Sequence, residues 1–188
     1  MYNIGLCICG SFCTFDKILK VLKKLVDGGH KVTVILSFAA AYDDTRFYKA
    51  EDFKAELKKI TGQEPICSLQ LAEPFGPKSN IDFMVVAPAT GNTISKIASG
   101  ITDTPVTMAV KAHLRNEKPV LIAVSTNDAL GANAINIAKL LNKKNVYFVP
   151  FKQDDYINKP TSLISDYDLI EKTIESAKIG KQVQPIIL

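Results

Sequence analysis

Apolar residues fall into short continuous runs that alternate with longer stretches of helical periodicity. The first run, Tyr2 to Cys9, is almost entirely apolar, as expected of a strand that is covered on both faces. It ends at Gly10-Ser11, and Thr14 then precedes a helix that ends at Gly28-Gly29. One face of this helix carries Ile18, Leu22, Leu25 and Val26. Strand, short loop and helix form the first unit.

The alternation continues through the middle of the chain. β-branched residues fill Lys31 to Leu36, and a later helical stripe consists of Ala50, Phe53, Leu57 and Ile60. A weaker run, Ile66 to Leu71, predicts a third strand. A loop through Pro74, Gly76 and Pro77 separates it from the strong strand Ile81 to Ala87.

Two helices are predicted directly after this strand, one near Thr93 to Ser99 and one that Thr104 caps, with Pro105 at its first position. Val120 to Val124 is the next strand and Val146 to Val149 the last parallel one. Between them, a helix face follows Gly131 and consists of Ile137, Leu140 and Leu141. The alternation predicts an α/β fold with a doubly wound parallel sheet of five or six strands and helices on both faces.

The pattern changes after Pro150. A polar, extended segment runs through Pro160, and the chain then predicts a helix and ends in the tail QVQPIIL. The inward face of this helix carries Leu169, Ile170 and Ile174. We therefore expect a single domain whose α/β part spans residues 1–150, with a C-terminal extension over residues 151–188 that packs on the domain or on a partner.

Length and composition agree with an ordinary globular domain. A chain of 188 residues can bury a core without disulfides or metals, and 47% of the residues are hydrophobic and 22% charged. No apolar run approaches the ~18 residues of a membrane span. The N-terminus has no basic segment followed by an apolar stretch, so we expect a cytoplasmic protein with no membrane role.

Charge and cysteine spacing exclude two further classes of site. The net charge of +4 is spread over lysine-rich helix faces without interleaved aromatic residues, which indicates a solvated surface rather than nucleic-acid binding. Cys7 and Cys9 lie in a strand, and no CxxC pairs or metal-spaced histidines occur, so no metal site is expected. Cys13 follows the first strand and could approach a ligand. His30 and His113 are more typical of structural positions.

Loops at the carboxyl ends of strands bind ligands in open α/β sheets. A dinucleotide site needs three glycines at G-x-G-x-x-G spacing after the first strand and an acidic residue after the second. This chain has only one glycine, Gly10, after the first strand, and Ser37 where the acidic residue would be expected. A turn of Gly10 and Ser11 ahead of a helix suits one phosphate, to which Ser37 could add a hydroxyl. The residues therefore favour a mononucleotide.

The stretch VVAPATGNTISKIASGITDTP, from Val85 to Pro105, forms the second candidate loop. Ala89 and Thr90 have little bulk, so a flat ring could lie close to their backbone. Asn92 and Thr93 could bind polar ring edges or a carboxylate. Alternatively, Thr90 or Asn92 only caps the following helix, and the residues alone leave both interpretations open.

This stretch also resembles a family signature. P-A-T-G-N-T-I-S-K-I-A-S-G-I-T-D is similar to the P-A-x-x-N-T-x-x-K-x-A-x-G-x-x-D motif of the homo-oligomeric flavin-containing cysteine decarboxylases, a superfamily that includes the flavin prenyltransferases. The resemblance implies a Rossmann-like sheet and an FMN near an interface between the copies of a homo-oligomer. It places the FMN phosphate at Gly10, Ser11 and Ser37, and the flavin ring near Ala89, Thr90, Asn92 and Thr93.

The chain departs from the decarboxylases after the strand Val120 to Val124. Where those enzymes have P-x-M-N, this chain reads Ser125-Thr126-Asn127-Asp128, and it has no equivalent of their catalytic histidine. Decarboxylation is therefore disfavoured. Ser125 is expected to face the cofactor, and Asn127 and Asp128 are the candidate catalytic residues, although Asp128 also suits a loop or cap. Lys111 or Arg115 could supply a cation for a dianionic substrate.

A narrower resemblance, to the B subunit of a two-subunit oxidoreductase, covers nearly the whole chain. It rests on I-G-L-C-I-C-G-S-F-C-T-F, A-V-S-T-N-D-A-L-G-A-N-A-I-N-I, N-V-Y-F-V-P-F-K-Q-D-D and G-K-Q-V-Q-P. It implies oxidation of a dihydropyridine dicarboxylate, or its hydrated precursor, to pyridine-2,6-dicarboxylate during sporulation, together with a separate A subunit. Because this chain lacks the dinucleotide fingerprint, we expect the A subunit to hold NADP. Two alternatives remain: a transferase like the flavin prenyltransferases, or a non-catalytic component that has kept the flavoprotein fold.

Overall fold

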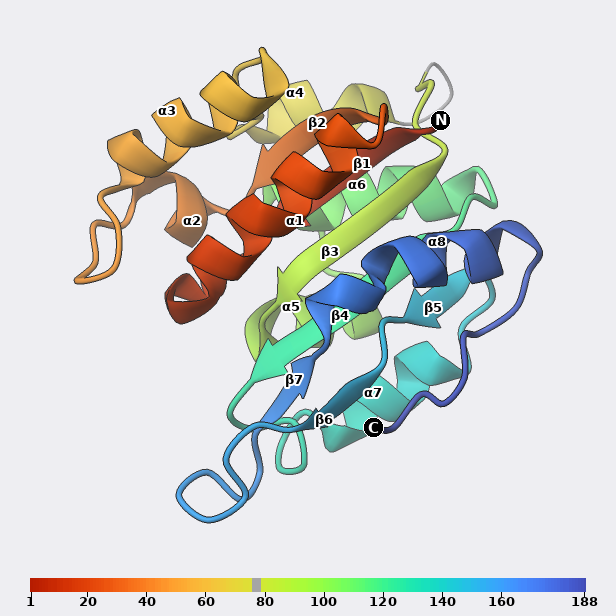
Figure 1. Cartoon of the computed structure of the whole chain (residues 1–188). Coiled ribbons are helices and arrows are strands. Elements are labelled where there is room, and N and C mark those ends of the chain that lie inside the picture. Colours follow the sequence, from red (N-terminus) through yellow and green to blue (C-terminus); the bar gives the residue numbers. More distant parts are fainter. Residues whose placement is uncertain (76–78) are drawn as a thin grey trace.

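A single sheet crosses the middle of the molecule (Figure 1). The computed structural model describes residues 1–75 and 79–188, and within these ranges the sheet has seven strands in the order β2-β1-β3-β4-β7-β6, with β5 also paired to β4. The parallel strands are β1 (Asn3–Ile8), β2 (Lys31–Leu36), β3 (Phe83–Ala89), β4 (Val120–Thr126) and β5 (Val146–Phe148). Two short strands, β6 (Phe151–Gln153) and β7 (Leu163–Ser165), are antiparallel to each other.

Helices cover both faces of this sheet (Figure 1). One face carries α1 (Phe15–Asp27), α3 (Ala50–Thr61) and α8 (Ile170–Lys178), and the other carries α5 (Gly91–Ser99), α6 (Pro105–Arg115) and α7 (Ala134–Leu141). Two short helices, α2 (Phe38–Tyr42) and α4 (Leu69–Ala72), complete the set, with 3-10 turns at Phe12–Thr14, Glu73–Phe75 and Tyr167–Leu169. None of the helices in the described ranges is long and apolar enough to cross a membrane. The predicted Rossmann-like doubly wound architecture is confirmed.

The central strands are apolar throughout because they contribute to two cores. In β1, Leu6 and Ile8 face the core beneath α1, whereas Cys7 joins the core beneath α5 and α6. Phe15 and Phe53 stack with ring centroids 4.1 Å apart, which joins α1 to α3. The sheet, covered by helices on both faces, supports the loops at the carboxyl ends of the strands.

The predicted third strand, Ile66 to Leu71, is wrong. Only Ile66 pairs with the sheet, through a single bridge to Ile35, and the Ser68 hydroxyl then accepts a hydrogen bond from Leu71 N and starts α4. A helix cap therefore outweighs a weak apolar strand signal. Pro74 lies in a 3-10 turn, while Gly76 and Pro77 lie outside the described residues.

One strand boundary and the burial of one helix residue also differ from the prediction. β3 continues through Pro88 to Ala89, with a register shift against β4 between Val86 and Ala89. Leu141 was expected on the buried face of α7, but 44% of it is exposed because it is the last residue of that helix.

The C-terminal extension contributes strands that the sequence did not predict. The segment after Pro150 was expected to be extended and polar, but it forms β6 and β7, which raises the strand count to seven. The far edge of β4 is shared: Val120–Ile122 pairs with β5, and Ser125–Thr126 pairs with β7. The tail then runs beside β6, since Phe151 N donates to Ile186 O and Leu188 N donates to Phe151 O.

His113 of α6 gives the fold a dependence on pH. The residue is fully buried, and its Nε2 lies 3.1 Å from Pro119 O, to which it donates. Burial and the nearby charge of Lys118 lower the pKa of His113 to about 4, below the ~6.5 of an unfolded chain. The unfolded state therefore binds the extra proton first, and the stabilisation by neutral His113 is complete above pH ~6.5 and is lost as the pH falls towards 4.

Because of His113, we expect the free energy of unfolding of the wild type to fall by up to about 3 kcal/mol between pH ~7 and pH ~4. Urea unfolding at several pH values measures the change. His113→Gln keeps a donor for Pro119 O but does not titrate in this range, so its stability is expected to fall less. An identical pH slope for the variant and the wild type would contradict the assignment.

Candidate functional site

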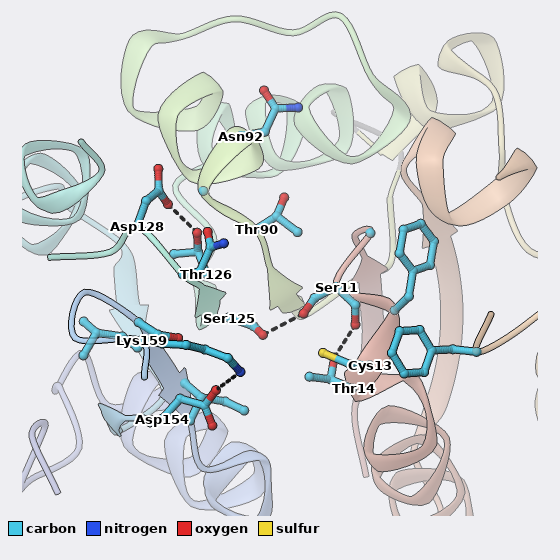
Figure 2. Close-up of a pocket in the computed structure, with 18 of the residues that line it drawn as sticks. Ser11, Cys13, Thr14, Thr90, Asn92, Ser125, Thr126, Asp128, Asp154 and Lys159 are labelled. Atoms are coloured by element: carbon cyan, nitrogen blue, oxygen red, sulfur yellow. Dashed lines mark hydrogen bonds and ion pairs between the residues drawn. The ribbon is translucent and has the colours of Figure 1, made fainter. Parts of the chain in front are cut away.

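A cavity of about 740 Å³ opens at the carboxyl ends of β1, β3 and β4 (Figure 2). The strand order reverses between β1 and β3, so the loops that follow these strands diverge and leave room for a ligand. The volume lies in the ~300–1,000 Å³ range of small-molecule sites. The walls come from the turn after β1, the loop between α2 and α3, the start of α5, the loop after β4 and residues 154–164 of the C-terminal extension.

Hydroxyl groups form one wall of the cavity. Ser11 Oγ and Ser125 Oγ lie 2.8 Å apart, and Thr14 Oγ1 donates to Ser11 O at 2.7 Å (Figure 2). The amide N–H of Ser11 already donates to Cys9 O at 2.8 Å. An anion at the Gly10-Ser11 turn would therefore meet the serine hydroxyls rather than this amide.

The start of α5 forms a second wall. Thr90 Oγ1 accepts a hydrogen bond from Thr93 N at 3.4 Å, so Thr90 caps the helix, while Asn92 is exposed at the cavity rim. Thr93 is buried, and its Oγ1 donates to Cys9 Sγ at 3.2 Å. Burial raises the pKa of the Cys9 thiol to about 11 against the opposing effect of this bond. Cys9 therefore stays a thiol at neutral pH and is no nucleophile.

The loop after β4 is held against α5 by Asp128. Its Oδ1 accepts from Thr126 Oγ1 and its Oδ2 accepts from Asn133 Nδ2, the latter at 2.7 Å. Gly91, the first residue of α5, lies against the same three side chains. Because both carboxylate oxygens are engaged, the geometry favours a loop role for Asp128 over that of a free base.

The C-terminal extension supplies the remaining wall. The β4–β7 register sets Ser125 opposite Ile164 and Thr126 opposite Leu163, which brings both apolar side chains to the cavity. Thr161 Oγ1 donates to Asn127 O at 2.6 Å and ties the extension to the loop after β4. The catalytic-loop candidates and the extension therefore form one connected rim.

Two cations line this cavity within the described chain, Arg46 and Lys159. The Arg46 guanidinium lies 4.8 Å from the centroid of the Phe47 ring, and Lys159 Nζ lies 3.2 Å from Asp154 Oδ2 (Figure 2). Lys111 and Arg115, which the sequence suggested, line a separate groove beside Ile97 and Leu114, so that expectation is wrong. No group of three or more His, Cys, Asp or Glu side chains in residues 1–75 and 79–188 could hold a metal ion.

The predicted site residues divide into two sets. Those that line the cavity are Gly10, Ser11, Thr90, Asn92, Ser125, Asn127 and Asp128. Ser37, Ala89 and Thr93 do not line it: Ser37 caps α2 by accepting from Ala40 N, and Ala89 is fully buried at the end of β3.

Comparison with known proteins assigns the chain to a family. The model of the family described as Flavoprotein matches residues 1–177. The chain belongs to the Flavoprotein family.

Relatives of this flavoprotein differ in how much they share with it. It is 43% identical over 186 residues to the B subunit of dipicolinate synthase from Bacillus subtilis, covering 99% of this chain and 93% of the relative. The crystal structure of the B subunit of dipicolinate synthase from Bacillus halodurans is 44% identical and superposes with a TM-score of 0.91, covering 100% and 96% of the two chains. DmrB from Burkholderia xenovorans, solved in complex with FMN, shares the fold at 19% identity and a TM-score of 0.69, covering 93% of each chain.

Sequence reasoning missed several cavity residues of the flavoprotein. Arg46 and Lys159 lie in loops and Ile164 lies in the three-residue strand β7, and none of these segments shows a periodicity that would mark a cavity residue. An arginine beside an aromatic residue, Arg46-Phe47, is the local signal that could have found the first of them. Cys13, which the sequence placed near a ligand, is exposed and lines the cavity.

Proposed function

We propose that this flavoprotein oxidises dihydrodipicolinate, or its hydrated precursor, to dipicolinate in the cytoplasm of sporulating cells, together with the separate A subunit of dipicolinate synthase. The observation that carries the proposal is the similarity to the B subunit of that enzyme over 99% of the chain. The cavity supports it, because two cations and a pair of serine hydroxyls converge where ligands bind in this fold. We also propose a homo-oligomer, supported by the exposed apolar residues Ile187 and Leu188 of the tail.

The hydrated precursor would first lose water to give the dihydropyridine. The oxidation then removes a hydride and a proton from the dihydropyridine ring, which becomes aromatic. Aromatisation favours hydride loss, so the protein has mainly to bind and orient the substrate. Each of the two substrate carboxylates needs a cationic hydrogen-bond donor in the cavity. Arg46 and Lys159 line the cavity and could each supply one. Asn127 and Asn92 are two of the uncharged polar residues of the cavity lining that are available to orient the substrate ring.

The residues present fit an FMN. Gly10, Ser11 and Ser125 offer small side chains and hydroxyls for a phosphate, whereas the Asp128 carboxylate makes the start of α5 unfavourable for a second anion. Thr90 and Asn92 would then lie near the ring. When bound, FMN supplies a hydride acceptor at its N5. NADP, for which this chain has no G-x-G-x-x-G turn, is assigned to the partner.

The proposal is tested by visible spectroscopy followed by a coupled assay. We expect the flavin bands to shift when FMN is added to the purified chain, and dipicolinate to form only when both this chain and the A subunit are present. Consumption of dimethylallyl phosphate by the chain alone would instead support a prenyltransferase. If FMN causes no shift and omission of the chain leaves dipicolinate formation unchanged, the proposal is wrong.

A further inference from the structure

Tyr167 lies behind the hydroxyl wall of the cavity. It follows β7, whose register brings Ile164 opposite Ser125, and its ring packs in the core with Phe15 and Val149. Only 6% of the residue is exposed, and its hydroxyl makes no hydrogen bond with any protein group in the described residues. Buried hydroxyl groups normally have a partner, so this one needs an explanation.

The groups around the Tyr167 hydroxyl belong to the cavity wall. The hydroxyls of Ser125 and Thr14 lie beside it, with Cys13 and Asp154 nearby. Burial raises the pKa of Tyr167, and the two neighbouring hydroxyls oppose that rise. Tyr167 therefore keeps its proton at neutral pH and is available as a donor.

The directions of the neighbouring hydrogen bonds decide which hydroxyl could accept a proton from Tyr167. Thr14 Oγ1 has committed its proton to Ser11 O at 2.7 Å. One hydroxyl proton bridges Ser11 and Ser125, whose oxygens are 2.8 Å apart. The Tyr167 hydroxyl makes no hydrogen bond in this structure, so its donation to the neighbouring Ser125 hydroxyl is the step that we infer. That donation would direct the Ser125 proton to Ser11 and the Ser11 proton to the cavity. All three O–H groups then point from the core to the ligand, and an oxyanion at the end would strengthen each bond in the chain.

We propose that Tyr167 is a positioning residue that orients the Ser125 and Ser11 hydroxyls as donors to an oxyanion, either a phosphate or a carboxylate, at the Gly10-Ser11 turn. The inference rests on the proposed function for the two candidate ligands, FMN phosphate and substrate carboxylate. It also gives the C-terminal extension a role, because Tyr167 of this extension supplies the first hydroxyl donor in the row of hydrogen bonds.

Tyr167→Phe tests this role because it removes only the hydroxyl. Thermal stability is expected to stay the same or rise, since no protein partner is lost. Dissociation constants are measured for FMN, riboflavin, pyridine-2,6-dicarboxylate and inorganic phosphate. We expect binding of inorganic phosphate to weaken about 3- to 10-fold. An equal loss for FMN with none for riboflavin identifies the flavin phosphate as the ligand, whereas a loss for pyridine-2,6-dicarboxylate identifies a carboxylate.

Two further variants separate positioning from a general structural role. Tyr147→Phe removes a half-buried hydroxyl on β5, outside the cavity lining, and is expected to change none of these constants. Ser125→Ala is expected to weaken anion binding as much as Tyr167→Phe does. The double variant is expected to lose no more affinity than Ser125→Ala alone, because both hydroxyls act in one chain of hydrogen bonds.

The inference is overturned if Tyr167→Phe binds all four probes like the wild type, if it loses riboflavin as much as FMN, or if the wild type binds none of the anions. Failure of the proposed function gives a different result. In that case the wild type shows Tyr167-dependent anion binding but forms no dipicolinate with the A subunit.

Discussion

Gly91→Ala is expected to lower the free energy of unfolding by about 1–3 kcal/mol and to weaken ligand binding in the cavity. An added Cβ at Gly91 would lie 2.5 Å from Asn133 Nδ2, 2.7 Å from Asp128 Oδ1 and 2.8 Å from Thr126 Oγ1. The three side chains hydrogen-bond to one another, with Thr126 donating to Asp128 Oδ1 and Asn133 to Asp128 Oδ2, so none can move away without losing a hydrogen bond. Either α5 or the loop after β4 must move, and both line the cavity.

Urea unfolding of the wild type and the variant measures the stability change, and a titration with FMN measures the effect on binding. Gly131→Ala is a matched control in the same loop, because the nearest atom to its added Cβ is Asp128 O at 3.5 Å, an ordinary contact. Its stability is expected to stay within ~0.5 kcal/mol of the wild type. Equal stability of the Gly91 and Gly131 variants would show that the two loops are not in tight contact.

Replacing both cavity cations, Arg46→Ala with Lys159→Ala, is expected to raise the KM for the dicarboxylate substrate more than about 100-fold. A hydrogen bond to a charged group contributes ~1.5–3 kcal/mol, which corresponds to about 10- to 150-fold for each cation. Lys159 already pairs with Asp154 at 3.2 Å, so the effect of Lys159→Ala alone is expected at the lower end of that range. Both side chains belong to exposed residues, so thermal stability is expected to change little.

Steady-state assays with the A subunit at several substrate concentrations separate KM from kcat. The matched control is Lys111→Ala with Arg115→Ala, which removes the same two charges from the separate groove beside α6 and is expected to leave KM unchanged. An equal rise in KM for the two double variants would point to net charge rather than direct contact. No rise in either would remove Arg46 and Lys159 from the substrate site.

The agreement between prediction and structure follows the length of each element. Long apolar runs such as Lys31 to Leu36 and the capped helix begun by Thr104 were predicted at their observed positions, because periodicity and capping are local properties. The run Ile66 to Leu71 failed because a Ser68 cap was competing with a weak strand signal. Thr93 was expected at the ligand, but its side chain is turned into the core, where it bonds to Cys9.

The sequence by itself determined the alternation of the five parallel strands with the main helices, the doubly wound fold and the two loops, after β1 and after β3, that form the centre of the cavity. Only the tertiary structure decided which distant segments complete that cavity. β7 has three residues, too few to show a period, and its pairing with β4 joins positions about 40 residues apart in the chain. That pairing brings Ile164 and Tyr167 to Ser125, and no local pattern of side chains encodes such a contact.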